Sequence, residues 1–205
     1  LFRSRAASDG SLATQLRGAE YSLTTKVGLT SDLVLDGTYN PDFSQVEADA
    51  TEVDVNLRSA VFYPEKRPFF LEGREHFGLA AMGGASPLRS AVYTRRIIDP
   101  VVGAKVSGKL GERHTVSTIY AVDDLVEPST GATSHAQIPV ARYKLSLSRD
   151  SFLGAIYAGR ETSTRSNRLG GLDGQVRLGR SGQLAFHALR TTTDVEGEPS
   201  TEAGH

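Results

Sequence analysis

The sequence contains no cysteine, no tryptophan and a single methionine among its 205 residues. The absence of cysteine excludes disulfide bonds and thiolate metal sites. Basic and acidic residues are nearly balanced, 23 against 24, so the basic excess typical of nucleic-acid-binding proteins is missing. No apolar run approaches the ~20 residues that a transmembrane helix needs. These absences leave two classes open, a soluble protein and a transmembrane β-barrel.

The two ends of the sequence do not resemble the ends of a complete exported protein. The chain begins with Leu1 instead of methionine, and residues 1–5 are too short and too polar for a signal peptide. We therefore expect a fragment of a longer protein. Its expected parts are a connecting segment at 1–16, a β-barrel portion at 17–194 with an inward segment at 40–100, and a polar loop or truncated end at 195–205.

Apolar and polar residues alternate along most of the chain, which is typical of β-strands with two different faces. Residues 141, 143, 145 and 147 are apolar, whereas 142, 144 and 146 are polar. The same pattern recurs in 21–29, 33–40, 102–110, 116–122, 153–157, 172–178 and 184–188. Tight connections at 30–32, 111–113, 149–150 and 180–182 alternate with longer polar ones at 123–138 and 161–167. Strands of ~9–11 residues with alternating connection lengths predict an all-β fold, an antiparallel transmembrane β-barrel that is present here in part.

The polar face of these strands carries charges that would face a wet lumen in a barrel: Lys105, Arg142, Lys144, Asp173 and Arg177. Apolar residues also fall on this face, so we expect part of the lumen to be packed: Ile119, Phe152, Ile156 and Leu189. Five tyrosines are candidates for the membrane interfaces: Tyr21, Tyr39, Tyr120, Tyr143 and Tyr157. A soluble antiparallel sheet with one solvated face is the alternative.

Two stretches between residues 40 and 100 differ from the rest of the chain. Asn40 to Asp49 reads Asn-Pro-Asp-Phe-Ser-Gln-Val-Glu-Ala-Asp, and Tyr63 to Gly73 reads Tyr-Pro-Glu-Lys-Arg-Pro-Phe-Phe-Leu-Glu-Gly. Both combine charge, aromatic rings and proline. Pro64 and Pro68 interrupt any strand ladder because proline has no backbone N–H to donate. We expect short strands at 52–62 and 89–97.

These two stretches closely resemble the barrel family catalogued as domain of unknown function 5916. The segment Tyr93-Thr94-Arg95-Arg96-Ile97 resembles the family's following Ser-Arg-Arg-type element, so the likeness spans about sixty residues. Members of this family resemble outer-membrane β-barrels and usually follow a domain similar to a family-9 carbohydrate-binding module. The resemblance implies a barrel in the cell outer membrane, with carbohydrate handling as a hint. It carries over no catalytic residue.

Two chemical roles of the central carboxylates are weighed against a structural one. A pair of carboxylates could hydrolyse a glycosidic bond, and oxygen ligands could bind calcium. Linear spacing does not bring a catalytic pair together, and the regular calcium-loop motif is missing. We expect no metal and no cofactor. The chain is more readily a non-enzyme, although a carbohydrate-active hydrolase using carboxylates of 42–72 and a soluble β-sheet binding module remain alternatives.

We favour an outer-membrane β-barrel that transports solutes or binds them at the surface, with a saccharide as one candidate. Its partners would be outer-membrane lipid and a small solute, and no nucleic acid. An inward loop must satisfy its own polar groups, and arginine pairs well with carboxylates in such a place. The residues predicted to form this lumen or gate motif are Asn40, Asp42, Gln45, Glu47, Asp49, Glu65, Lys66, Arg67, Glu72, Arg95 and Arg96.

Overall fold

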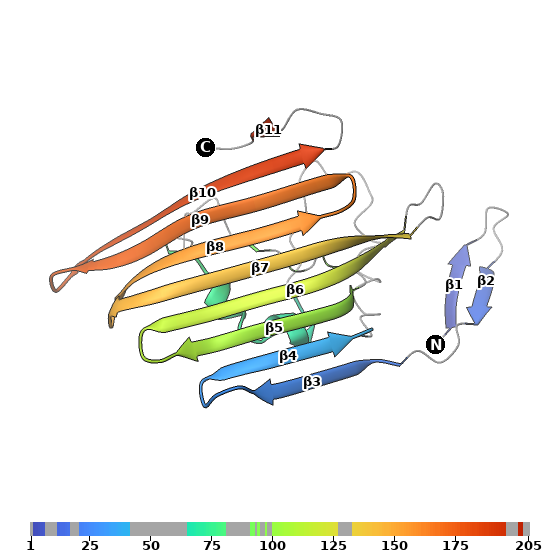
Figure 1. The fold of residues 1–205 in the computed structure, drawn as a ribbon, viewed down its shortest axis with the longest axis horizontal. Coiled ribbons are helices and arrows are strands. Elements are labelled where there is room, and N and C mark those ends of the chain that lie inside the picture. Colours follow the sequence, from blue (N-terminus) through green and yellow to red (C-terminus); the bar gives the residue numbers. More distant parts are fainter. Residues whose placement is uncertain are drawn as a thin grey trace.

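The computed structural model describes residues 2–6, 12–16, 21–41, 65–80, 91–92, 94, 97, 100–126, 133–195 and 201–202. Most of them form one antiparallel sheet in which each strand pairs with its neighbours in the sequence, from β3 to β11 (Figure 1). Its strands are β3 (Leu23–Gly28), β4 (Leu33–Tyr39), β5 (Pro100–Leu110), β6 (His114–Val126), β7 (Thr133–Ser148), β8 (Ser151–Glu161), β9 (Arg165–Leu178), β10 (Gly182–Val195) and β11 (Thr201–Glu202). The predicted all-β antiparallel fold is confirmed. A separate hairpin pairs β1 (Phe2–Ala6) with β2 (Leu12–Leu16).

The described strands form an open sheet. Strands β3 and β11 lie at its two ends, and no pairing between described strands joins these ends. Every residue of β3 is exposed, and β11 pairs with β10 only at Thr192 and Thr193. The described residues therefore provide the antiparallel order of the predicted barrel but not its closure.

The four predicted tight turns are confirmed and lie along one edge of the sheet, at the left in Figure 1. They occupy 29–32, 111–113, 149–150 and 179–181. Gly111 and Gly179 adopt φ angles of 68° and 63°, a conformation that glycine reaches without steric cost. The turn chemistry visible in the sequence thus fixes where the chain reverses.

The bounds of both predicted long connections, 123–138 and 161–167, are wrong, since β6 extends to Val126 and β7 begins at Thr133. Strand β8 ends at Glu161 and β9 begins at Arg165, so only residues 162–164 connect them. The Thr162 hydroxyl donates to the Arg165 carbonyl at 2.9 Å and accepts from the Arg165 N–H at 3.0 Å. The polar residues after 164 continue the strand because the ladder needs only backbone groups. Side-chain polarity therefore underestimated the strand length.

The segment 65–80 packs on the inner face of the sheet. It contains the helical turn α2 (Pro68–Leu71) and the 3₁₀ turn η1 (Arg74–Phe77), which lie behind the sheet in Figure 1. Its Phe70 and Phe77 join Ile97 and the sheet residues Ile119, Ala121, Ile138 and Val140 in one buried cluster. Burial of each phenylalanine contributes roughly 1.5–3 kcal/mol. The apolar residues predicted on the polar face thus pack part of the inner surface, with Ile119 and Ile156 buried.

The outer face of the sheet exposes apolar side chains. The large ones on strands β4 to β10 are Tyr39, Val102, Leu110, Tyr120, Tyr143, Leu147, Leu153, Tyr157, Leu172, Leu178, Leu184 and Phe186. Charged residues of the same strands, among them Lys105, Arg142 and Asp173, are buried on the inner face. This distribution is the reverse of that in a soluble sheet with a solvated outer face. No helix in the described part of the chain is long and apolar enough to cross a membrane.

The predicted strand at 89–97 is wrong for the residues that the structure describes there. Ala91, Val92, Thr94 and Ile97 belong to no strand, and the Ile97 N–H donates to the Thr94 carbonyl at 2.9 Å. This turn directs two backbone carbonyls toward Arg67. The predicted strand at 52–62 lies outside the described residues.

Candidate functional site

Lys105 is the first of two buried cations that fasten the segment 65–80 to the sheet. It lies on β5 opposite Asp36 of β4, and its Nζ is 3.3 Å from Asp36 Oδ2. The same ammonium donates to the carbonyls of Phe69 at 2.8 Å and Glu72 at 3.0 Å. Carbonyls at a helix end lack partners within the helix, so Lys105 supplies the donors that α2 needs. The neighbouring Gly103 leaves room for the Phe69 ring, which a Cβ would approach to 3.2 Å.

Arg142 on β7 is the second cation, and it pairs with Asp173 on β9. Its Nη1 and Nη2 lie 2.6 and 2.8 Å from the two carboxylate oxygens, and both side chains are fully buried. Asp173 also accepts the Ala80 N–H at 2.7 Å, and Arg142 donates to the Gly78 carbonyl at 3.3 Å. The pair therefore holds the end of the segment that follows η1. This bidentate geometry is the strong form of an ion pair.

The Arg142–Asp173 pair crosses the intervening strand β8 at Gly154. Gly154 lies opposite Asp173 in the register, and a Cβ there would be 2.5 Å from both Arg142 Nη1 and Asp173 Oδ1. Only a residue without a side chain lets these two groups meet above the strand. The glycine is therefore part of the fastening.

Glu65 and Arg67 form a buried clasp within the segment. The Arg67 Nε and Nη2 lie 2.8 Å from Oε1 and Oε2 of Glu65, and the guanidinium stacks 4.3 Å from the Phe70 ring centroid. Arg67 further donates to the carbonyls of Ile97 at 2.6 Å and Thr94 at 2.8 Å. The Thr94 hydroxyl donates back to Glu65 at 2.6 Å. The clasp therefore ties Glu65 and Arg67 to Thr94 and Ile97.

The environment of Glu65 favours its ionised form. Burial by itself would raise the pKa of Glu65, but the hydrogen bonds from Arg67 and Thr94 outweigh burial and lower this pKa to about 2. The carboxylate is consequently charged at neutral pH and already accepts five hydrogen bonds. This arrangement suits a structural role.

The other described residues of the predicted motif lie at the surface. Glu72 binds Lys26 of β3 at 2.5 Å, and this hydrogen bond holds the pKa of Glu72 below its usual value. The Lys66 N–H donates to Glu65 at 3.1 Å. Asn40 adopts a φ of 44°, and its side-chain amide donates to the Tyr21 carbonyl at 3.2 Å. The predicted residues Asp42, Gln45, Glu47, Asp49, Arg95 and Arg96 lie outside the described residues.

The predicted wet lumen is wrong for three of the charges on the inner face. Lys105, Arg142 and Asp173 are buried beneath the segment 65–80 and are paired there. Sequence reasoning placed them on the correct face but did not identify them as the attachment points, and it missed Lys26 and Asp36. The sequence signal for these attachment points was a single charged residue on the polar face of each strand. The signal was insufficient because the partner of each charge, on another strand, is set by the strand register.

Acid–base and metal chemistry receive little support from this geometry. The ionised Glu65 cannot donate a proton as a general acid near neutral pH. Within the described ranges, no group of three or more His, Asp or Glu residues is placed to hold a metal ion. The arrangement can fix a loop against a sheet and can present polar groups beside it.

Fold and site together define an antiparallel β-sheet protein whose inner face is fastened to an inserted segment. A family model described as "Domain of unknown function (DUF5916)" matches residues 5–117, which is more than half of the chain. The chain belongs to this family, as its two motifs predicted. The match includes β3, β4, β5 and the segment 65–80. No curated protein and no solved structure matches the chain.

Proposed function

We propose that the chain forms part of an outer-membrane β-barrel that passes or binds small solutes, with the segment 65–80 lying in its lumen. The observation that carries the proposal is the distribution of side chains over the two faces of the sheet. The outer face exposes leucine, valine and aromatic residues, whereas the inner face buries charged residues. An outer-membrane barrel needs both features, because lipid surrounds it and polar groups line its interior.

The height of the apolar region supports this proposal. On the outer face of β6, apolar side chains and Thr118 lie between His114 and Asp124. These ten residue steps correspond to about 33 Å along a strand. A tilt of ~40° reduces this length to about 25 Å across the membrane, close to the apolar band of such barrels.

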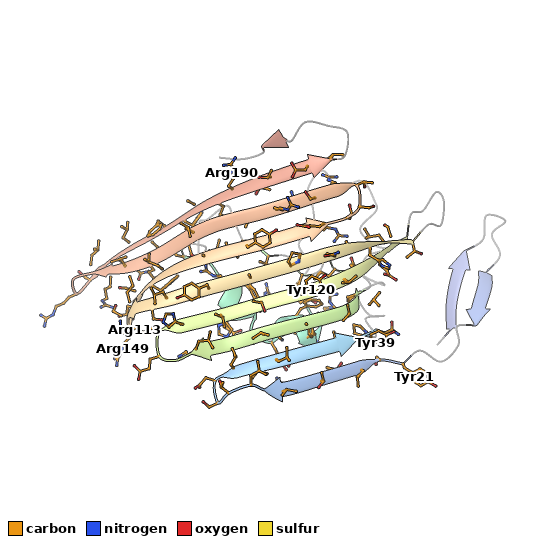
Figure 2. The ribbon with its side chains drawn as sticks, viewed as in Figure 1. Tyr21, Tyr39, Arg113, Tyr120, Arg149 and Arg190 are labelled. Carbon is orange, nitrogen blue, oxygen red and sulfur yellow. The ribbon has the colours of Figure 1, made fainter. Side chains whose placement is uncertain are left out.

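Polar pairs lie at the edge of the sheet opposite the tight turns and mark the other boundary of this apolar region. Asp124 contacts His135 at 2.7 Å, and Arg168 lies 2.8 Å from Glu161 and 3.8 Å from Asp194. Figure 2 shows Tyr39 toward this edge, while Arg113 and Arg149 lie at the tight-turn edge. In barrels of this class the short turns face the periplasm. We therefore assign the tight turns to the periplasmic side.

The fastening of the segment 65–80 agrees with a location inside a barrel. A loop in the lumen must satisfy its backbone groups within the protein or with water. Lys105, Arg142 and Asp173 do this for three carbonyls in the middle and at the end of the segment and for the Ala80 N–H. A saccharide remains a candidate solute, on the strength of the family resemblance alone.

Cysteine labelling tests the proposal, and the absence of native cysteine makes the experiment simple. Ala185 and Ala188 both lie on β10 but point to the inner and outer face, respectively. We expect Ala188→Cys in outer-membrane vesicles to react with a lipid-soluble maleimide and to resist a charged, water-soluble one. The matched variant Ala185→Cys should react with the water-soluble reagent. Rapid reaction of Ala188→Cys with the water-soluble reagent would exclude the membrane location and favour the soluble module.

A further inference from the structure

We infer that four hydrogen-bond donors on the inner face of β6 and β7 bind the anionic group of a solute, a carboxylate, sulfate or phosphate. These residues, named here the donor patch, are Thr115, Ser117, Arg142 and Lys144. The inference rests on the proposed function only in taking the inner face as the lumen. It specifies the chemical class of the solute.

The strand register places the four residues together. Thr115 lies opposite Lys144, and Ser117 lies opposite Arg142. Directly opposed residues have Cβ atoms roughly 5 Å apart, and residues two positions apart on a strand are separated by about 7 Å on the same face. The four polar side chains are therefore neighbours on the inner face.

Two buried polar atoms of the donor patch have no partner. Arg142 Nε and Ser117 Oγ are inaccessible to solvent and make no hydrogen bond. The carboxylate of Asp173 accepts from both terminal nitrogens of Arg142 and from the Ala80 N–H, but from neither of these two atoms. Buried polar groups in native proteins are nearly always paired, so an orphaned donor beside a free cation indicates a missing acceptor.

Lys144 provides a positive charge that no carboxylate neutralises directly. Among the described residues, none offers a carboxylate oxygen within ion-pair distance of its ammonium, which lies 5.5 Å from the Phe152 ring centroid. The acidic side chains that act on Lys144 are Asp173 and Glu75. Asp173 pairs with Arg142, and Glu75 lies 3.6 Å from His76. Lys26 and Lys105, in contrast, each have a carboxylate partner.

Isothermal titration of the full-length protein in detergent micelles with inorganic phosphate tests the inference. We expect Lys144→Met to weaken phosphate binding by about tenfold or more, because a charge-assisted contact is lost. Ser117→Ala should weaken it severalfold. The control Lys26→Met removes an equal charge from a lysine that is 56% exposed and lies on β3, three strands from β6, and it should change the Kd by less than about twofold.

Each outcome of the titration is decisive. Equal weakening by Lys144→Met and Lys26→Met would overturn the inference, since it would reduce the effect to net charge. Absence of phosphate binding to the unmodified protein would overturn it as well. Circular dichroism of each variant checks that the fold is retained, and Ser117→Ala provides a nearly isosteric second test. Because titration in micelles does not depend on lipid, failure of cysteine labelling and failure of phosphate binding are separable results.

Discussion

At the scale of single residues, the clasp between Glu65 and Arg67 combines charge, hydrogen bonding and burial within three positions of the chain. Glu65 accepts from backbone and side-chain donors at once, and Arg67 uses its remaining donors on the carbonyls of Thr94 and Ile97. A buried ion pair adds little over well-packed apolar residues, but removal of one partner leaves an uncompensated charge. The clasp is therefore sensitive to single substitutions.

Glu65→Gln should loosen the segment 65–80. It leaves the buried Arg67 guanidinium without its counter-charge, and we expect a loss of about 3–5 kcal/mol of local stability. Hydrogen exchange of the amides of residues 66–80 measures this loss. The control Glu75→Gln alters a side chain that is 73% exposed and should change exchange by less than about 0.5 kcal/mol. Equal protection in the two variants would contradict a structural role for Glu65.

The same carboxylate should make the segment sensitive to acid. Because the pKa of Glu65 is lowered from 4.5 to about 2, the folded clasp binds a proton less readily than the unfolded chain does. Its stabilisation is complete above about pH 5 and disappears as the pH falls toward 2, an effect of roughly 3 kcal/mol at most. Limited proteolysis between pH 7 and pH 2 should show this loss, and Glu65→Gln should flatten the profile. An unchanged profile in the variant would assign the acid sensitivity to another group.

At the scale of elements, strand β8 lies between β7 and β9, and a glycine in β8 lets a charged side chain of β7 reach one of β9. Arg142 and Asp173 belong to β7 and β9, and their groups meet above Gly154. The pair in turn binds the backbone at Gly78 and Ala80. A substitution in β8 should therefore affect the segment 65–80, although β8 itself does not bind that segment through this pair.

Gly154→Ala should displace the Arg142–Asp173 pair and destabilise the protein by about 1–3 kcal/mol. The added Cβ would lie 2.5 Å from both charged groups. Gly170→Ala on β9 is the matched control, since a Cβ there meets nothing within 4 Å. Chemical denaturation followed by circular dichroism should separate the two variants. Similar midpoints would mean that the ion pair rearranges around a methyl group at no cost.

The strands and the tight turns could be predicted from the sequence because both depend on local chemistry. Alternation identified the two faces, and glycine identified turns such as that at Gly111. The attachment of the segment could not be predicted, because Lys105 meets Asp36, and Arg142 meets Asp173, only through a register between distant residues. The burial of these charges could not be predicted either, because a water-filled lumen would give the same alternation of apolar and polar residues.

At the scale of the whole molecule, the two faces of the sheet differ in the kind of substitution that they should tolerate. Leu172 on β9 is 62% exposed on the apolar face, whereas Gln183 on β10 is exposed on the inner face. In a soluble sheet, a charge at an exposed leucine is harmless. In a membrane-facing sheet, it must enter lipid.

Leu172→Arg should reduce the amount of protein recovered in the outer-membrane fraction, because arginine near the bilayer centre costs about 2–4 kcal/mol on a barrel surface. Gln183→Arg should leave recovery unchanged. Immunoblotting of membrane fractions from cells that express each variant measures the difference. Normal recovery of Leu172→Arg would argue that its face never meets lipid.

The segment 65–80 is inserted between two strands that are paired with each other. Strands β4 and β5 are in register from Leu33 and Gly108 to Tyr39 and Val102, and the Asn40 N–H then donates to the Val101 carbonyl at 2.7 Å. The chain thus leaves the sheet and returns to it at adjacent points. The pairing of β4 with β5 therefore does not require the residues between them, although the segment 65–80 is bound to the inner face by Lys105 and Arg142. Replacement of residues 41–99 by a two-residue hairpin turn should keep β4 and β5 in register and would uncover Lys105, Arg142 and the apolar cluster of the inner face as a surface for design.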